Sequence, residues 1–177
     1  MERYNLNDTD KKLIEIALQV LEKNFDDGIY NHTVGCAILC KNGNIYKGVN
    51  CDGIHGSCAE YVTMGIAISA GEREFDTIVA VHEKAPNGVF SPCGNCRQML
   101  YEYCPDIMVI VNDENGNLIK VKARDLLPFA WQPVVCIFFP TLNRQRQRPL
   151  RRSRILKFCA HLVQLLLLHT FQSISFP

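Results

Sequence analysis

Two short cysteine motifs, far apart in the chain, set the tightest limit on how this sequence can fold. The first reads Cys58-Ala59-Glu60 and the second reads Pro92-Cys93-Gly94-Asn95-Cys96. Each stands where a helix is predicted to begin, the first behind Ser57 as a possible N-cap. Cys-x-x-Cys in a chain with no apolar signal segment after Met1 favours a metal over disulfides. We therefore predict a fold that brings both helix starts, and three thiolates, to one point.

The three thiolates are suited to one zinc ion per chain, with Cys58, Cys93 and Cys96 as ligands. Zinc held by three protein ligands keeps a fourth position for water, which is the pattern of a catalytic rather than a structural site. Glu60 lies two residues after the first ligand, so its carboxylate is the candidate that carries a proton from water to a substrate nitrogen. Alone, Cys93-x-x-Cys96 would fit a structural zinc knuckle or two buried thiols equally well.

Charge balance predicts a further role beside the ligands. Three thiolates around Zn²⁺ leave a net charge of −1, which opposes the lowering of the pKa of a bound water. The N–H groups of two helix starts would offset part of that charge. Arg97 follows Cys96 directly, and we expect it to tune the centre in the same way.

Alternating helical and strand patterns predict an α/β fold with a mixed five-stranded sheet covered by helices. Apolar residues at helical spacing predict a first helix from Asn7 to near Gly28, and helices over 57–70 and 93–103 follow. The predicted strands are 33–39, 45–49, 75–82, 107–111 and 118–121. The first two form a hairpin, and Asn42-Gly43 between them is typical of a type I′ turn.

Charge divides the chain into two unlike parts. Residues 1–125 hold 12 lysines and arginines against 18 acidic residues, a net charge of −6, whereas residues 126–177 hold seven basic residues and no acidic one. We expect one domain over 1–131 and an atypical tail over 132–177, with six arginines between Arg144 and Arg154. The leucine-rich stretch 155–168 is too short and too polar to cross a bilayer, so no membrane span is expected. Because no apolar signal segment follows Met1, the compartment is predicted to be cytoplasmic.

Both cysteine motifs together match the zinc deaminase signature in its three-cysteine form. The chain resembles the cytidine deaminase superfamily over residues 7–131, most specifically in the segment S-P-C-G-N-C-R-Q from Ser91 to Gln98. Gly48-Val49-Asn50 and Leu126-Leu127-Pro128 look most like the blasticidin-S deaminases within it. The resemblance implies a three-layer α/β/α sandwich, a homotetramer, and hydrolytic deamination at C4 of a cytosine nucleoside with release of ammonia.

The resemblance also implies residues that contact the substrate. Nucleoside deaminases of this branch hold the ribose hydroxyls with an Asn-x-Glu pair, and the matching residues here are Asn50 and Asp52. An acid at this position is unfavourable beside the carboxylated sugar of blasticidin S unless a cation such as His55 lies between them. The other predicted contacts are Thr33, Ala59, Ser91 and Trp131, of which Trp131 stands near the aromatic that closes over the base.

Four functions stay open at this point. Deamination of blasticidin S comes first, and deamination of cytidine or deoxycytidine comes second. A polynucleotide deaminase that uses the arginines of the tail is disfavoured, because the first motif lacks the histidine usual in that class and a basic run alone is weak evidence. A non-catalytic zinc-binding module is disfavoured because it would have no need of Glu60.

Overall fold

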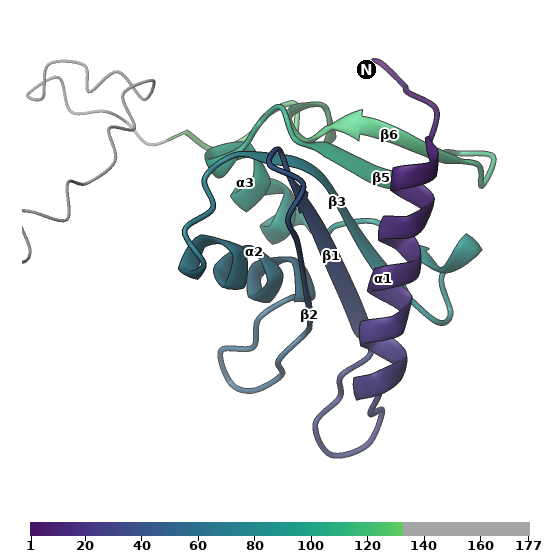
Figure 1. The fold of residues 1–177 in the computed structure, drawn as a ribbon, viewed down its shortest axis with the longest axis vertical. Coiled ribbons are helices and arrows are strands. Elements are labelled where there is room, and N and C mark those ends of the chain that lie inside the picture. The colour runs from purple at the N-terminus through teal and green to yellow at the C-terminus, as the bar shows by residue number, and fades with distance from the viewer. Residues whose placement is uncertain (133–177) are drawn as a thin grey trace, which may run out of the picture. The chain divides into compact units, whose positions relative to one another are not determined.

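A mixed β-sheet forms the centre of the molecule. The structure is a computed structural model that describes residues 1–132, so the predictions made for the tail lie outside the described residues. The strands run in the order β2-β1-β3-β5-β6 across the sheet (Figure 1). Their bounds are Val34–Cys40 for β1, Ile45–Val49 for β2, Phe75–His82 for β3, Met108–Asn112 for β5 and Leu118–Lys122 for β6.

Strand directions confirm that the sheet is mixed. Strands β3 and β5 pair in parallel, and the other neighbouring strands pair antiparallel. A further strand of two residues, β4 (Val89–Phe90), pairs with β3 and was not predicted. It is too short for a hydrophobic pattern to reveal, yet it delivers the chain to the second cysteine motif.

One helix covers the first face of the sheet. Helix α1 spans Asp8–Asn24, and Asn7 and Asp10 form a capping box at its start. It ends at Asn24, earlier than the predicted Gly28. Its apolar stripe packs on strand residues that all point to this face; the buried cluster is Leu13, Ile14, Ala17, Leu21, Ala37, Val79, Val81, Val89 and Ile110.

Two helices cover the opposite face and complete the predicted three layers. Helix α2 spans Ala59–Ser69 and helix α3 spans Gly94–Tyr103. Figure 1 shows both on the side of the sheet away from α1. Alternate strand residues point to this face, as period-2 geometry requires, and bury a second cluster that includes Ile38, Ile78, Val109, Met64 and Leu100. Among residues 1–132, no helix has both the length and the apolar character that crossing a membrane requires.

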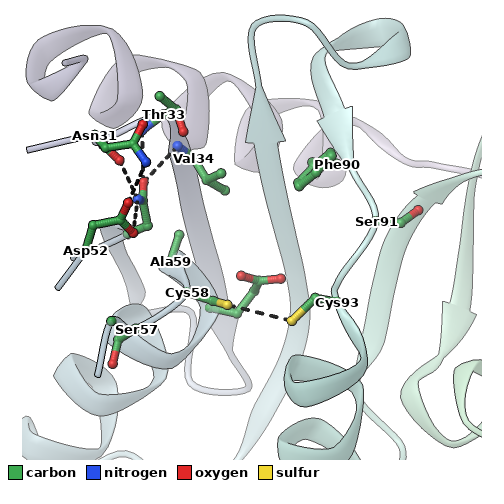
Figure 2. Close-up of a pocket in the computed structure, with 13 residues that line it drawn as sticks. Asn31, Thr33, Val34, Asp52, Ser57, Cys58, Ala59, Phe90, Ser91 and Cys93 are labelled. Atoms are coloured by element: carbon green, nitrogen blue, oxygen red, sulfur yellow. Dashed lines mark hydrogen bonds between the residues drawn. The ribbon is translucent and has the colours of Figure 1, made fainter. Parts of the chain in front are cut away.

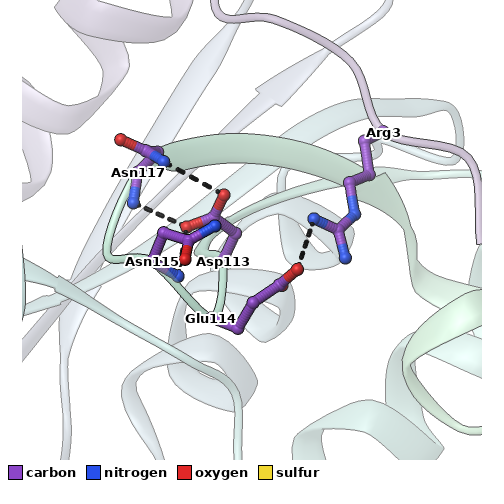
Figure 3. Close-up of polar contacts among 5 residues, drawn as sticks. All are labelled: Arg3, Asp113, Glu114, Asn115 and Asn117. Carbon is purple, nitrogen blue, oxygen red and sulfur yellow. Dashed lines mark hydrogen bonds and ion pairs between the residues drawn. The ribbon is translucent and has the colours of Figure 1, made fainter.

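Tight turns close the β1–β2 and β5–β6 hairpins. The β1–β2 turn closes with Gly43 N donating to Cys40 O at 2.9 Å, and Gly43 has φ +90° while Asn42 has no positive φ. The predicted type I′ turn is therefore wrong, since that turn needs positive φ at both central residues. In the β5–β6 turn, the Asp113 carboxylate accepts hydrogen bonds from Asn115 N and Asn117 N (Figure 3). Figure 3 also shows Arg3 paired with Glu114. The backbone groups of Tyr4 exchange two hydrogen bonds with Lys120, which joins the N-terminal segment to β6.

Strand β1 approaches α1 so closely that only glycine fits at position 35. A Cβ on Gly35 would lie 2.6 Å from Ala17 O and 2.8 Å from Leu21 Cβ. Because one of these atoms belongs to the backbone of α1, the whole helix would have to move away from the sheet to admit a larger residue.

Gly35→Ala is expected to lower the free energy of unfolding by about 1–3 kcal/mol, measured by urea unfolding. Gly65→Ala is the matched control; it meets nothing within 4 Å on α2 and should stabilise by about 0.5–1 kcal/mol. Equal midpoints for the two variants would contradict this account.

Candidate metal centre and substrate pocket

The three cysteines of the two motifs meet at one point, as predicted. Their Sγ atoms all lie within 4.8 Å of one another, and Cys58 Sγ is 3.7 Å from Cys93 Sγ. Cys58 is the N-cap of α2 and Cys93 is the N-cap of α3, while Cys96 lies buried in the first turn of α3. Ser57 therefore precedes the cap rather than forming it. Figure 2 shows Cys58 and Cys93 facing each other from the two helix starts.

Local electrostatics distinguish the three thiols. Burial works to raise the pKa of Cys93, but hydrogen bonds, the backbone N–H of Cys96 foremost, outweigh it and hold the pKa below its usual value. Burial raises the pKa of Cys58 and of Cys96. Three soft sulfur donors at this spacing are the ligand set that zinc prefers. Within the part of the chain that the structure describes, this is the one such group of three ligand side chains.

Glu60 is placed beside the cysteines inside a pocket of about 340 Å³. It stands in the first turn of α2 and is 5% exposed. Cys58 and Cys93 line the same pocket, so the carboxylate and the sulfur atoms share one space. Burial raises the pKa of Glu60 above its usual value, against hydrogen bonds from its own backbone and from Cys96 that lower it. The pocket thus holds a buried carboxylate beside two of the three converging cysteines.

Five of the six predicted substrate contacts line this pocket. They are Thr33, Asn50, Asp52, Ala59 and Ser91. Trp131 does not line it; its backbone N and O bind the amide of Gln98, and its side chain is 64% exposed. His55 is also absent from the lining and lies exposed in the loop before Cys58. In this chain no cation from His55 stands at the Asp52 end of the pocket.

Asn50 is the polar anchor of the pocket wall that Thr33, Val34 and Asp52 also line. Its side chain is nearly buried, and Oδ1 accepts from Thr33 N and Val34 N, both at 2.9 Å. These two backbone donors fix the orientation of the amide. Its Nδ2 donates to Asn31 O at 2.7 Å and to Asp52 Oδ1 at 3.3 Å. All four hydrogen-bonding positions of the amide are therefore engaged within the protein.

Arg97 connects the second motif to the end of the domain. Its Nε donates to Pro92 O at 2.8 Å and its Nη1 donates to Leu126 O at 3.3 Å. The guanidinium thus holds the residue before Cys93 by its carbonyl group. A second link joins the two helix starts, where Tyr61 Oη donates to Asn95 Oδ1 at 3.1 Å. The predicted influence of Arg97 on the charge of the thiolates stays a prediction.

Three pocket residues of note were not identified from the sequence. Asn31 has φ +52° and reaches Asp52 with its side chain; Val34 begins β1; and Phe90 belongs to the unpredicted β4. Figure 2 shows Phe90 and Ser91 across the pocket from Asn31 and Asp52. Asn31 is the one with a sequence signal, because asparagine is enriched at positive φ, but that signal does not disclose a partner 21 residues away.

The fold and the site together define a metal-dependent hydrolase with three sulfur ligands and one buried carboxylate. Residues 7–112 match the family model described as the cytidine and deoxycytidylate deaminase zinc-binding region. The chain belongs to this family. It is therefore a zinc-dependent deaminase that acts on cytosine nucleosides.

Individual relatives and solved structures agree with this assignment. The chain is 34% identical to the blasticidin-S deaminase of Bacillus cereus over 74% of this chain and 98% of that protein. It is 35% identical to the cytidine deaminase of Sporosarcina psychrophila over 55% of this chain and 74% of that protein. The crystal structure of cytidine deaminase from Burkholderia pseudomallei aligns with TM-score 0.58 and 33% identity, covering 68% of this chain and 98% of that one.

Proposed function

We propose that Cys58, Cys93 and Cys96 hold the zinc ion and that Glu60 is the catalytic acid-base. The observation that carries this proposal is the shared pocket, in which a 5% exposed carboxylate lies with Cys58 and Cys93, two of the three cysteines whose sulfur atoms converge. When bound, zinc supplies a water molecule of lowered pKa and so makes water a nucleophile at neutral pH. The remaining work of the reaction falls to side chains of this chain.

Glu60 moves the protons in this proposal. Its carboxylate accepts a proton from the attacking water and delivers it to N3 of the cytosine ring while the carbon–oxygen bond forms at C4. It then accepts the remaining proton from the new C4 hydroxyl group and delivers it to the amino group. The C4–N bond breaks, ammonia leaves, and the C4 oxygen becomes the carbonyl of the uracil form. Ala59 begins α2, so its backbone N–H has no acceptor within the helix and is free for the base. Thr33 and Ser91 line the pocket from opposite walls and are the proposed neighbours of the substrate there.

We infer blasticidin S as the first candidate substrate. The similarity to the blasticidin-S deaminase of Bacillus cereus runs through 98% of that protein, whereas the similarity to the cytidine deaminase of Sporosarcina psychrophila covers 74% of it. Cytidine or deoxycytidine is the second candidate, and Asp52 favours it. A carboxylate in the pocket accepts hydrogen bonds from sugar hydroxyls, but it repels a carboxylated sugar ring.

Loss of the cytosine chromophore distinguishes the two candidates. Blasticidin S, cytidine and deoxycytidine are supplied in parallel to the zinc-loaded full-length chain, and ultraviolet absorbance is followed. Turnover of blasticidin S alone supports an antibiotic-resistance enzyme, and turnover of cytidine alone supports pyrimidine salvage. Absence of turnover on all three, with one zinc ion bound per chain, would overturn both candidates.

We further propose that the chain assembles as a homotetramer, as the resemblance to nucleoside deaminases implies. Large apolar side chains stand exposed on the described part of the chain, among them Ile54, Phe129 and Trp131, with exposed fractions of 99%, 98% and 64%. Burial of such side chains between subunits is favourable. Light scattering after gel filtration measures the assembly, and a monomer at micromolar concentration would contradict it.

A further inference from the structure

Asn31 stands at the edge of the pocket in a backbone conformation that few residues adopt. Its φ is +52°, in the left-handed region, which asparagine and glycine tolerate better than other residues. From there its Nδ2 donates to Asp52 Oδ2 at 2.5 Å, and its own carbonyl oxygen accepts from Asn50 Nδ2. Figure 2 shows Asn31 and Asp52 linked in this way beside Thr33. One residue therefore contacts both members of the predicted sugar-binding pair.

The neighbouring residues hold this segment in place. The ring of Tyr30 stacks on the ring of His32, with centroids 6.0 Å apart. His32 Nδ1 lies 2.8 Å from Asn50 O, and a carbonyl oxygen can only accept, so Nδ1 carries the proton. On the other side, Thr33 N and Val34 N donate to Asn50 Oδ1. Asn31 is thus fixed from both sides, and its amide reaches the pocket from a defined position.

Among residues 1–132, each of the two carboxylate oxygens of Asp52 has one hydrogen-bond donor. Asn31 donates to Oδ2 and Asn50 donates to Oδ1. An ionised carboxylate has about four acceptor positions, so positions for further donors remain on the pocket side. Asn50 has no such capacity left, because its amide is fully engaged. The hydroxyl groups of a bound sugar therefore have Asp52 as their acceptor.

We propose that Asn31 is a positioning residue that aims the Asp52 carboxylate at the sugar hydroxyls and so selects nucleosides with hydroxylated sugars. This inference rests on the second proposed substrate class, cytidine or deoxycytidine, because Asp52 accepts hydrogen bonds from sugar hydroxyls and repels the carboxylated sugar of blasticidin S. Asn31 acts through Asp52, so its contribution requires both the Asp52 carboxylate and a hydroxyl on the ligand. A role in shaping the turn alone would affect every ligand of the pocket alike.

The contribution of Asn31 to nucleoside affinity is measured in a chain that binds the ligand without converting it. The zinc-loaded full-length chain carrying Glu60→Gln is titrated calorimetrically with cytidine and with 2′,3′-dideoxycytidine, which lacks the sugar hydroxyls at these positions. Asn31→Gly in that background keeps the left-handed backbone accessible and removes only the amide. We expect the affinity for cytidine to fall about tenfold, in the range for a hydrogen bond to a charged group, and the affinity for dideoxycytidine to change less than about twofold.

Two further variants test the route through Asp52. Asp52→Asn should also weaken cytidine selectively, and the combination with Asn31→Gly should lose no more than Asp52→Asn alone, because coupled residues are not additive. Asn87→Gly is the matched control: Asn87 has φ +53° but binds Asn112 and Gly116 outside the pocket. It should leave both affinities unchanged. Zinc content and the unfolding midpoint confirm that each variant is folded.

Several results would overturn the inference. Equal losses for the two nucleosides would assign Asn31 to the turn, and additive losses with Asp52→Asn would separate it from that residue. Unchanged cytidine affinity would remove its role, as would failure of the parent chain to bind cytidine at all. If Asn31→Gly does not fold, Asn31→Asp gives the same test, since it tolerates the backbone and replaces the donor with a second negative charge. The proposed function is tested separately, by turnover with Glu60 in place.

Discussion

Replacing Glu60 with glutamine is expected to lower turnover by about 10²–10⁴-fold, the usual contribution of a positioned general acid-base. Glutamine keeps the size of the side chain, but its amide can neither accept the proton from water nor deliver it to N3. Because Glu60 is not one of the three converging sulfur ligands, zinc should stay at one ion per chain. Ultraviolet loss of the cytosine chromophore and metal analysis of the same sample measure the two quantities together.

Glu15→Gln is the control for the change of charge. Glu15 is exposed on α1, and α1 covers the face of the sheet opposite to the pocket. It should retain full turnover. If Glu60→Gln kept turnover within tenfold of the native chain, the acid-base role would have to pass to another group. If it lost zinc as well as activity, the carboxylate would be supporting the metal centre instead.

Replacing Cys96 with alanine is expected to remove both the metal and the activity. Cys96 is fully buried in the first turn of α3, and its loss leaves two of the three sulfur ligands. Zinc bound only by the native state stabilises it by mass action. Its loss should lower the unfolding midpoint by about 5–10 °C, if zinc is present near a hundredfold above its dissociation constant. Metal content and thermal unfolding are the measurements.

Cys104→Ala separates this effect from the loss of any thiol. Cys104 lies at the end of α3, outside the cluster, and burial raises its pKa to about 12, so it stays a protonated thiol. We expect this variant to keep one zinc ion per chain and full turnover, with at most a small loss of stability. Full zinc content in Cys96→Ala would show that Cys58 and Cys93 hold the metal with a different third ligand.

Strong local signals made much of the fold predictable. The bounds of β2 and β3 agree with the predicted 45–49 and 75–82. Strand β3 carries a largely apolar run of strand length, and the turn residues Asn42 and Gly43 separate β2 from β1. The turn at Asn42-Gly43 was misassigned because its type depends on the φ of Asn42, which the residue identity alone does not determine. Strand β4 has only two residues, too few for an alternating hydrophobic pattern, so it is recognised only by its pairing with β3.

The convergence of the three cysteines could be predicted from the sequence, whereas the contact between Asn31 and Asp52 could not. Each motif carries its cysteine at a helix start, so placing two local elements places the ligands. Asn31 meets Asp52 only because the backbone turns into the left-handed region and β1 lies beside β2. That contact depends on tertiary structure, and no spacing in the sequence encodes it. Trp131 illustrates the converse, since a position matched by resemblance lies outside the pocket of this chain.

The sheet divides the interior into two buried clusters, and only one of them adjoins the chemistry. The α1 cluster contains none of the pocket residues, whereas the opposite cluster includes Ala59 and neighbours of Glu60 on α2. We therefore expect the two layers to tolerate substitution differently. Substitutions beneath α1 have to preserve side-chain volume and the close approach at Gly35. Substitutions beneath α2 and α3 also have to preserve the positions of two helix starts, so we expect them to affect the pocket more.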